Sequence, residues 1–195
     1  MTRSFAVTWD YRCPFARNAH EAVVRGLQAG NDWQVRFMAF SLDQTHVEED
    51  APPVWERPPA DRGSGLVALT WGIAVRDGFR EHFLDFHLAT FAARFDHGRK
   101  ISQESTLREV ATEVGLAPDA VAERVATGRP MNTLAAEHAE AVRGWDVFGV
   151  PTFISGDEAA FVRFTERGRV DDLERFLDLL EWTRLNEMKR TRIPN

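Results

Sequence analysis

Cys13, the only cysteine in the chain, is the residue whose type and setting point most directly to chemistry. It follows a short apolar stretch and a polar turn, and Pro14 comes directly after it. Proline is favoured in the first turn of a helix, because its missing N–H costs no hydrogen bond there and its φ is already suitable. The sequence therefore predicts that Cys13 lies at or next to the N-cap of a helix.

A cysteine in that position is expected to be nucleophilic. The unpaired N–H groups and the positive end of the helix dipole favour a thiolate over a thiol. Arg12 and Arg17 lie close by in the sequence and could add positive charge. The alternative is a buried cysteine that acts as a small apolar side chain, which is common for a lone cysteine. The Cys-Pro context favours the reactive interpretation.

Length and composition predict a globular protein with a substantial core. The chain has 195 residues, of which 44% are hydrophobic and 11% aromatic, enough for one large domain or a domain with an insertion. A net charge of −6 argues against nucleic acid as the main partner. A single cysteine excludes an internal disulfide framework, and no segment has the pattern of a signal peptide or membrane span. We therefore expect a cytoplasmic protein with no membrane partner.

The residues around Cys13 show a strand, helix and strand pattern. Residues 4–9 and 33–40 are predicted strands, and residues 14–29 carry apolar side chains at the spacing of one buried helix face. A unit of this kind forms two parallel strands joined by a right-handed crossover.

A long loop is expected over residues 41–65, which carry an acidic run and two Pro-Pro pairs without any periodicity. Trp55 within it either anchors the loop to the core or lines a pocket near Cys13.

Residues 66–142 are predicted to be helical throughout. Their apolar side chains recur at helical spacing, and phenylalanine is dense between residues 82 and 95. Trp71 and Phe79 are further candidates for lining a pocket, although stripes of this kind usually belong to a core. The histidines of the chain have no dense set of carboxylate or cysteine partners, so no metal site is predicted. Three helices are expected at residues 105–114, 118–126 and 131–143.

The C-terminal part begins with the segment Gly149-Val150-Pro151-Thr152-Phe153-Ile154. Residues 152–154 are predicted to form a strand, with Pro151 at its first position, where a sheet tolerates proline. A turn at Gly156 leads to a second strand over residues 160–164, and an amphipathic helix is predicted over 171–183.

This order of elements and motifs resembles the DsbA-like branch of the thioredoxin fold, and the resemblance covers nearly the whole chain. It implies an α/β protein with a thioredoxin-like βαβ…ββα sheet and a large all-helical insertion. The single domain would span residues 1–195. Its thioredoxin-fold parts would lie at about 1–42 and 145–185, with the insertion at about 66–143 and a basic C-terminal tail at 186–195.

In that family the proline of the Val-Pro-Thr motif is cis and faces the reactive cysteine. The resemblance implies a cis Val150–Pro151 bond, which is credible only before proline, and a Val150 backbone free to pair with an extended substrate. It implies catalytic roles for Cys13, Pro14, Ala16 and Pro151. The residues expected to bind substrate or thiol are Asp10, Tyr11, Arg12, Phe15, Val150, Thr152 and Trp55.

Two of these residues keep alternative roles. Asp10 could orient the turn before Cys13 or shuttle a proton. The hydroxyl of Tyr11 could donate to a bound thiolate or cap the loop. The ending Glu187–Arg192 resembles the tail of the mycothiol-dependent nitroreductase and FrnE-like group, or is simply a solvated basic tail.

One departure from the family pattern limits the chemistry. Oxidoreductases of this family usually carry Cys-x-x-Cys, whereas the fourth position here is Ala16. No second thiol can attack a mixed disulfide formed at Cys13, so an intramolecular dithiol cycle is closed to this chain.

Three functions remain open. The predicted one is a thiol-dependent oxidoreductase with a monothiol mechanism, in which Cys13 attacks a small disulfide or electrophile and an external thiol, mycothiol or glutathione, resolves the product. It would need no tightly bound cofactor and would be a monomer or homodimer. The second is an isomerase or transferase that binds its thiol non-covalently, resembling 2-hydroxychromene-2-carboxylate isomerase or kappa-class glutathione transferases. The third is a non-catalytic binding module.

Overall fold

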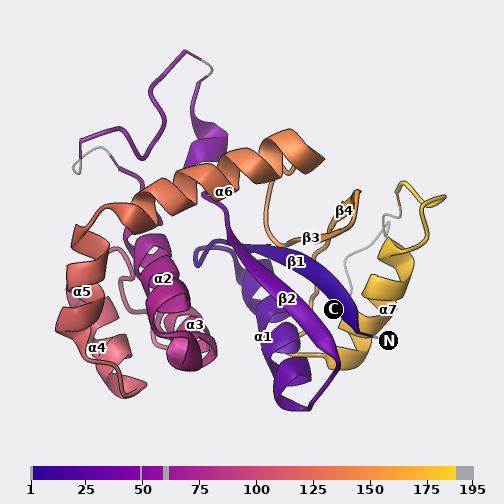
Figure 1. Cartoon of the computed structure of the whole chain (residues 1–195), viewed down its shortest axis with the longest axis horizontal. Coiled ribbons are helices and arrows are strands. Elements are labelled where there is room, and N and C mark those ends of the chain that lie inside the picture. Colours follow the sequence, from indigo (N-terminus) through magenta and orange to yellow (C-terminus); the bar gives the residue numbers. More distant parts are fainter. Residues whose placement is uncertain (1, 49, 59–61, 188–195) are drawn as a thin grey trace.

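A computed structural model describes residues 2–48, 50–58 and 62–187 of the protein. At its centre is a four-stranded sheet in the order β2-β1-β3-β4 (Figure 1). The first two strands are parallel, and β3 is antiparallel to both of its neighbours. The strands are β1 (Arg3–Trp9), β2 (Trp33–Ala39), β3 (Thr152–Ser155) and β4 (Glu158–Phe161).

Helix α1 (Pro14–Gln28) connects the two parallel strands. Its small and branched apolar residues Ala19, Ala22 and Val23 are buried, as their helical spacing predicts. The chain then leaves the helix through Gly30, whose φ of 85° lies in the left-handed region that favours glycine. The predicted strand, helix and strand unit is confirmed.

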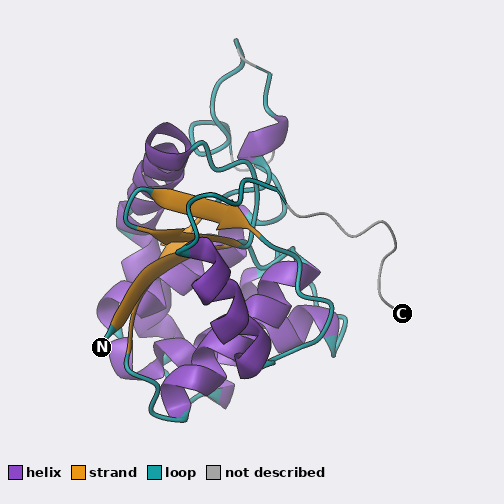
Figure 2. Ribbon diagram, turned by 90° about the vertical axis from the view of Figure 1, so that its right-hand side faces the viewer, coloured by secondary structure: helices purple, strands orange, loops and turns teal. Residues whose placement is uncertain are grey.

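Five α-helices lie between β2 and β3 in the part of the chain that is described. The most apolar of them, α2, is covered by α3, α5 and α6, which explains why it lacks a polar face. In Figure 2 most of the helices lie on one side of the sheet. These five helices are α2 (Leu66–Gly78), α3 (Arg80–Phe95), α4 (Glu104–Glu113), α5 (Pro118–Ala126) and α6 (Arg129–Trp145).

The C-terminal hairpin and helix differ from the prediction in their bounds. Gly156 and Asp157 form a tight turn, so that Ser155 pairs with Glu158 and β4 starts two residues earlier than expected. The strand ends at Phe161 rather than residue 164. Helix α7 (Val170–Leu180) ends three residues before the predicted end, and a turn follows it.

The mixed α/β architecture predicted from the sequence is confirmed: a thioredoxin-like sheet with a helical insertion. The long loop includes one 3-10 turn, η1 (Gln44–His46). The predicted basic tail lies outside the described residues from residue 188 onwards. Within the part of the chain that is described, no helix has the length and apolarity needed to cross a membrane.

Candidate active site

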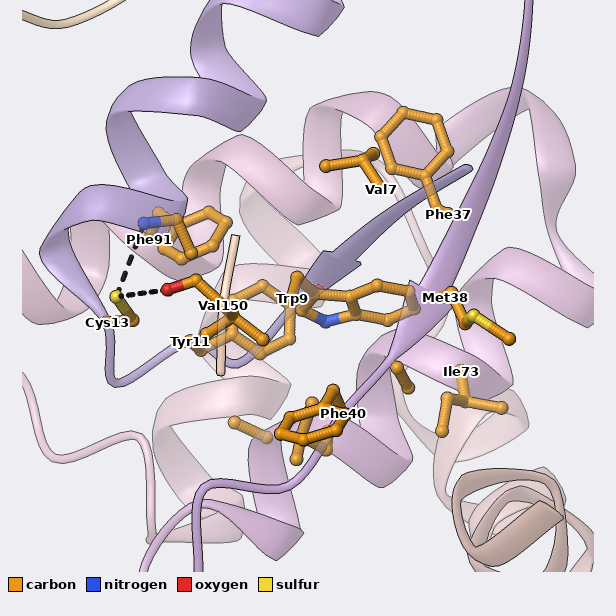
Figure 3. Packing of buried hydrophobic residues seen from close by; sticks show 14 of the residues in the cluster. Val7, Trp9, Tyr11, Cys13, Phe37, Met38, Phe40, Ile73, Phe91 and Val150 are labelled. Carbon is orange, nitrogen blue, oxygen red and sulfur yellow. Dashed lines mark hydrogen bonds between the residues drawn. The ribbon is translucent and has the colours of Figure 1, made fainter. Parts of the chain in front are cut away.

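Cys13 is the N-cap residue of α1, as the sequence predicts, and Pro14 opens the helix. Its backbone is extended, with φ −92° and ψ 119°, and its Sγ accepts a hydrogen bond from the backbone N–H of Ala16 at 3.4 Å. The thiol donates in turn to the carbonyl oxygen of Val150 at 3.2 Å (Figure 3). With 9% of its surface exposed, Cys13 lies at the boundary between core and solvent.

Pairing of β1 with β3 brings Val150 to Cys13 across 137 positions of sequence. The segment is held by two threonines: Thr152 donates its N–H to the Thr8 hydroxyl at 2.9 Å, and its own hydroxyl donates to the Gly149 carbonyl at 2.8 Å. The Val150–Pro151 peptide bond is cis. Thr152 is therefore buried beneath the loop and positions it.

Burial raises the pKa of the Cys13 thiol above its ordinary value. The N–H groups of Ala16 and Phe15 at the helix end act in the opposite direction, with a smaller effect, and the nearby Asp10 carboxylate adds to the rise. The expectation of a resting thiolate is therefore wrong: desolvation outweighs the helix terminus. The resting state is a neutral thiol that donates a hydrogen bond.

Neither Arg12 nor Arg17 has its charge free to stabilise a thiolate at Cys13. Arg12 pairs with Asp43 at 2.6 Å and with Asp10 at 3.4 Å. Arg17 is buried and pairs with Glu21 at 3.0 Å and with Asp96. Both guanidinium groups are thus neutralised locally, which corrects the expectation that they stabilise a thiolate.

The Asp10 carboxylate holds the turn that precedes Cys13. It is fully buried and accepts backbone N–H groups from Arg12 and from Leu42, each at 2.9 Å. Burial raises its pKa, while Arg12 and these two hydrogen bonds lower it. The hydrogen bonds of the sulfur go to Val150 and Ala16, so the contacts support the orienting role of Asp10 rather than proton transfer.

Tyr11 begins a buried hydrogen-bond chain that was not predicted from the sequence. Its hydroxyl lies 2.8 Å from His87 Nδ1, His87 Nε2 lies 2.9 Å from His20 Nδ1, and His20 Nε2 lies 3.1 Å from the Thr8 carbonyl. Because that carbonyl only accepts, His20 must donate through Nε2, which makes its Nδ1 the acceptor of His87 Nε2–H. The remaining nitrogen of His87 then accepts the proton of Tyr11.

This hydrogen-bond chain corrects the prediction that the hydroxyl of Tyr11 donates to a bound thiolate. All three side chains are fully buried, so the hydroxyl of Tyr11 is occupied by His87 and does not face a ligand at Cys13. Burial lowers the pKa of His20 to about 4 and holds the pKa of His87 well below its ordinary value. Both rings are neutral near pH 7, in agreement with the hydrogen-bond directions.

Trp55 and Trp71 line a cavity of about 630 Å³ between the long loop and helices α2, α4, α5 and α6. Cys13, Val150 and Pro151 are not among the residues that line it. The expectation that Trp55 forms a wall of the Cys13 pocket is therefore not met, because its indole packs on His138 instead, with ring centroids 5.5 Å apart.

The outer side of Cys13 carries aromatic residues and one arginine. Phe148 is 70% exposed and packs on Phe161 with ring centroids 5.2 Å apart. Arg163 lies over the rings of Phe15 and Phe161, each at 5.4 Å. Of these residues only Phe15 was predicted from the sequence to lie at the site. The signal for the others was weak, since each lies in or beside a short hairpin.

Comparisons with known proteins agree with this geometry. A family model described as the DSBA-like thioredoxin domain matches residues 80–178, just over half of the chain. No curated protein sequence matches the chain.

Three solved structures are similar in fold. The thiol-disulfide exchange protein alpha-DsbA2 from Wolbachia pipientis has a TM-score of 0.61 and 22% identity, over 91% of this chain and 81% of its own. The cytosolic disulfide reductase DsbM from Pseudomonas aeruginosa with GSH has a TM-score of 0.63 and 17% identity, over 93% and 100%. 2-Hydroxychromene-2-carboxylate isomerase has a TM-score of 0.64 and 17% identity, over 93% and 97%.

Proposed function

This chain belongs to the DSBA-like thioredoxin domain family, and we propose from that premise that it is a thiol-dependent oxidoreductase with a monothiol mechanism. Cys13 is the nucleophile, and an external low-molecular-weight thiol is the resolving partner. The observation that carries this proposal is the position of the Cys13 sulfur, at the N-cap of α1 and 3.2 Å from the Val150 carbonyl. An extended substrate that pairs with Val150 would pass directly beside the sulfur.

The proposed reaction has two exchange steps. Cys13 loses its proton, and the thiolate attacks one sulfur of a disulfide RS–SR, forming Cys13–SR and releasing RS⁻, which takes up a proton. The thiolate of an external thiol R′SH then attacks the R sulfur of the mixed disulfide. The products are RS–SR′ and the Cys13 thiolate, which is reprotonated. Overall, R′SH and RS–SR give RS–SR′ and RSH, and Cys13 is unchanged.

The Val150 carbonyl links substrate docking to activation of the sulfur. In the resting state this carbonyl accepts the Cys13 S–H. A substrate N–H that reaches the same oxygen takes its place, so the thiol loses its acceptor when the substrate arrives. The backbone N–H groups of Ala16 and Phe15, which lower the pKa of Cys13, remain to stabilise the thiolate that forms.

The proposal is tested by mass spectrometry of the native protein after incubation with oxidised glutathione and, separately, with oxidised mycothiol. We expect a single-thiol adduct on Cys13 that an excess of reduced thiol removes. The rate of alkylation by iodoacetamide should rise with pH through a pKa above the ordinary cysteine value, because burial disfavours the thiolate. Absence of both adducts and of alkylation up to pH 10 would refute the mechanism.

The variant Ala16→Cys tests whether the missing second thiol is the reason that an external thiol is needed. Ala16→Cys adds one sulfur at a buried position three residues after Cys13 and restores the Cys-x-x-Cys spacing. The adduct should then be released without added thiol, since the second sulfur attacks the mixed disulfide. Persistence of the adduct in both the wild type and the variant would show that the sulfur added at position 16 does not reach the mixed disulfide at Cys13.

The neutral resting thiol favours a second candidate function. A buried S–H that donates to a carbonyl resembles a hydroxyl in its chemistry, and it could orient a non-covalently bound thiol in an isomerase or transferase. Fold similarity to 2-hydroxychromene-2-carboxylate isomerase is compatible with this. Cys13→Ser distinguishes the two functions: activity with added thiol is retained in the second and lost in the first.

A further inference from the structure

Four residues form a strip along the outer side of Cys13. Phe15 lies two residues after Cys13, in the first turn of α1, and Phe161 is the last residue of β4. Val162 donates its N–H to the carbonyl of Pro151 at 3.2 Å, which extends the hairpin along the cis segment. Val162, which lies between Phe161 and Arg163, thus ties the strip to the cis segment, and Phe15 belongs to α1, so the strip lies beside both elements that hold the sulfur. Its members are Phe15, Phe148, Phe161 and Arg163.

Arg163 differs from the other arginines near the sulfur. Arg12 and Arg17 each pair with two carboxylates. Arg163 is exposed, and among the described residues no carboxylate lies within 4.0 Å of it. Its charge is nevertheless felt at Cys13, whose pKa it lowers. It is therefore a positive charge beside the sulfur that no partner in the described chain neutralises.

The guanidinium is also held in place. It lies 5.4 Å from the ring centroids of both Phe15 and Phe161, an arrangement in which the ring faces attract a cation. Clamping between two rings reduces the conformational entropy that a long side chain loses on binding a ligand. The N–H donors of the Arg163 guanidinium are thus already positioned to bind a carboxylate.

We propose that Arg163 determines specificity by binding a carboxylate of the external thiol or disulfide that reacts at Cys13. The inference rests on the proposed function and narrows its co-substrate. Glutathione, a peptidic thiol, carries two carboxylates, whereas mycothiol presents sugar hydroxyls and an amide and has no carboxylate. The structure therefore assigns the co-substrate to the carboxylate-bearing class, with Phe148 and Phe161 as the apolar surface beside it.

The test compares two alkylating reagents that differ in charge. Iodoacetate and iodoacetamide react with the same thiolate, so any change in the pKa of Cys13 affects both rates equally. Their rate ratio isolates the attraction of a carboxylate to the site. In Arg163→Gln the iodoacetate to iodoacetamide ratio should fall about fivefold at low salt, and this difference should shrink as salt is added. Arg163→Lys keeps the charge and should retain at least half of the wild-type ratio.

Arg175→Gln is the matched control, because it removes the same charge from another exposed position. Helix α7 at this point lies beside the C-terminal end of α1, where Asn31 donates to Glu174 at 2.9 Å, and Cys13 caps the opposite end of that helix. The ratio should be unchanged. A ratio that stays constant in Arg163→Gln, or falls equally in both variants, would overturn the inference.

A second pair of probes uses disulfides. Oxidised glutathione should form the adduct on Cys13 faster than cystamine, whose ends are cationic, and Arg163→Gln should remove that preference. Equal preference in wild type and variant would overturn the inference while leaving the monothiol mechanism intact. A Cys13 inert to every reagent would instead overturn the proposed function, and the inference with it.

Discussion

The two sides of Cys13 are built in opposite ways. Beneath it, Asp10 and Tyr11 are fully buried, and the side chains of Asp10, Tyr11, His87 and His20 all have hydrogen-bond partners within the protein. On the outer side Phe148 is 70% exposed, and the cation of Arg163 lies over two aromatic rings with no carboxylate partner among the described residues. One side fixes the position of the sulfur, and the other leaves surface for a ligand.

This difference shows how a reactive group can be rigid and accessible together. Satisfied buried polar networks hold one arrangement, because breaking any member leaves an unpaired group in a low-dielectric interior. Exposed aromatic residues contribute little to folding and retain their apolar area for binding. Substitutions on the two sides should therefore separate stability from ligand recognition.

His87→Ala should have the largest effect on stability. It creates a cavity and leaves both the Tyr11 hydroxyl and His20 Nδ1 without a partner, so we expect a loss of about 4 kcal/mol in the free energy of unfolding. Urea unfolding followed by circular dichroism measures it. The control is His97→Ala, at an exposed position, which should change the same quantity by less than about 0.5 kcal/mol. Similar losses in both variants would contradict the buried network.

Acid should have the second-largest effect on stability, and it acts on the buried side beneath Cys13. The pKa of His20 falls from 6.5 to about 4 on folding, so the unfolded chain binds the proton more tightly than the folded protein. Stability contributed by the neutral ring is complete above pH 6.5 and is lost as pH falls towards 4, by about 3 kcal/mol. Urea midpoints measured from pH 7.5 to 4.5 test this. His20→Gln should make the profile shallower without abolishing the slope, because burial also lowers the pKa of His87 and of His138. An unchanged slope would exclude His20 as a contributor.

Tyr11→Phe separates the structural role of the hydroxyl from a role in thiolate binding. It removes the donor to His87 Nδ1 and should cost about 2 kcal/mol of unfolding free energy. The rate of Cys13 alkylation at 25 °C should stay within about twofold of the wild type, because the hydroxyl does not contact the sulfur. A much larger rate change would restore the role in thiolate binding.

Phe148→Ala should have the smallest effect on stability. Its side chain is 70% exposed, and its loss should cost about 0.5 kcal/mol or less. Formation of the glutathione adduct should nevertheless slow, because the apolar surface beside the sulfur shrinks. Adduct formation timed by mass spectrometry measures this, and an unchanged rate would remove Phe148 from the strip that contacts the ligand.

The elements around the sulfur were predictable because their signals are local. Cys13 followed by Pro14 predicts an N-cap cysteine, and the α1 stripe that includes Ala19, Ala22 and Val23 predicts its buried face. The hairpin was predicted as well, although its register depended on how tightly Gly156 turns. Predictions from motifs of adjacent residues hold in the folded protein because backbone sterics and capping act over only a few positions.

The contacts across the site were not predictable in the same way. Tyr11 and His87 are 76 positions apart, and neither sequence context indicates a partner. Arg163 follows a short hairpin with no recognisable motif, and its position over Phe15 depends on the packing of that hairpin against α1. Trp55 was expected at the sulfur because pockets favour aromatic residues, yet helix packing directs it to His138.

The sequence by itself determined that this chain carries one N-cap cysteine with Ala16 in place of a second thiol, and hence that no second thiol of its own can resolve a mixed disulfide at Cys13. Only the tertiary structure decided the protonation state of that cysteine. A helix N-terminus and nearby arginines indicate a thiolate, but burial against Val150 and the pairing of Arg12 and Arg17 with carboxylates reverse the balance. Desolvation depends on everything packed around a group, and no local motif specifies it.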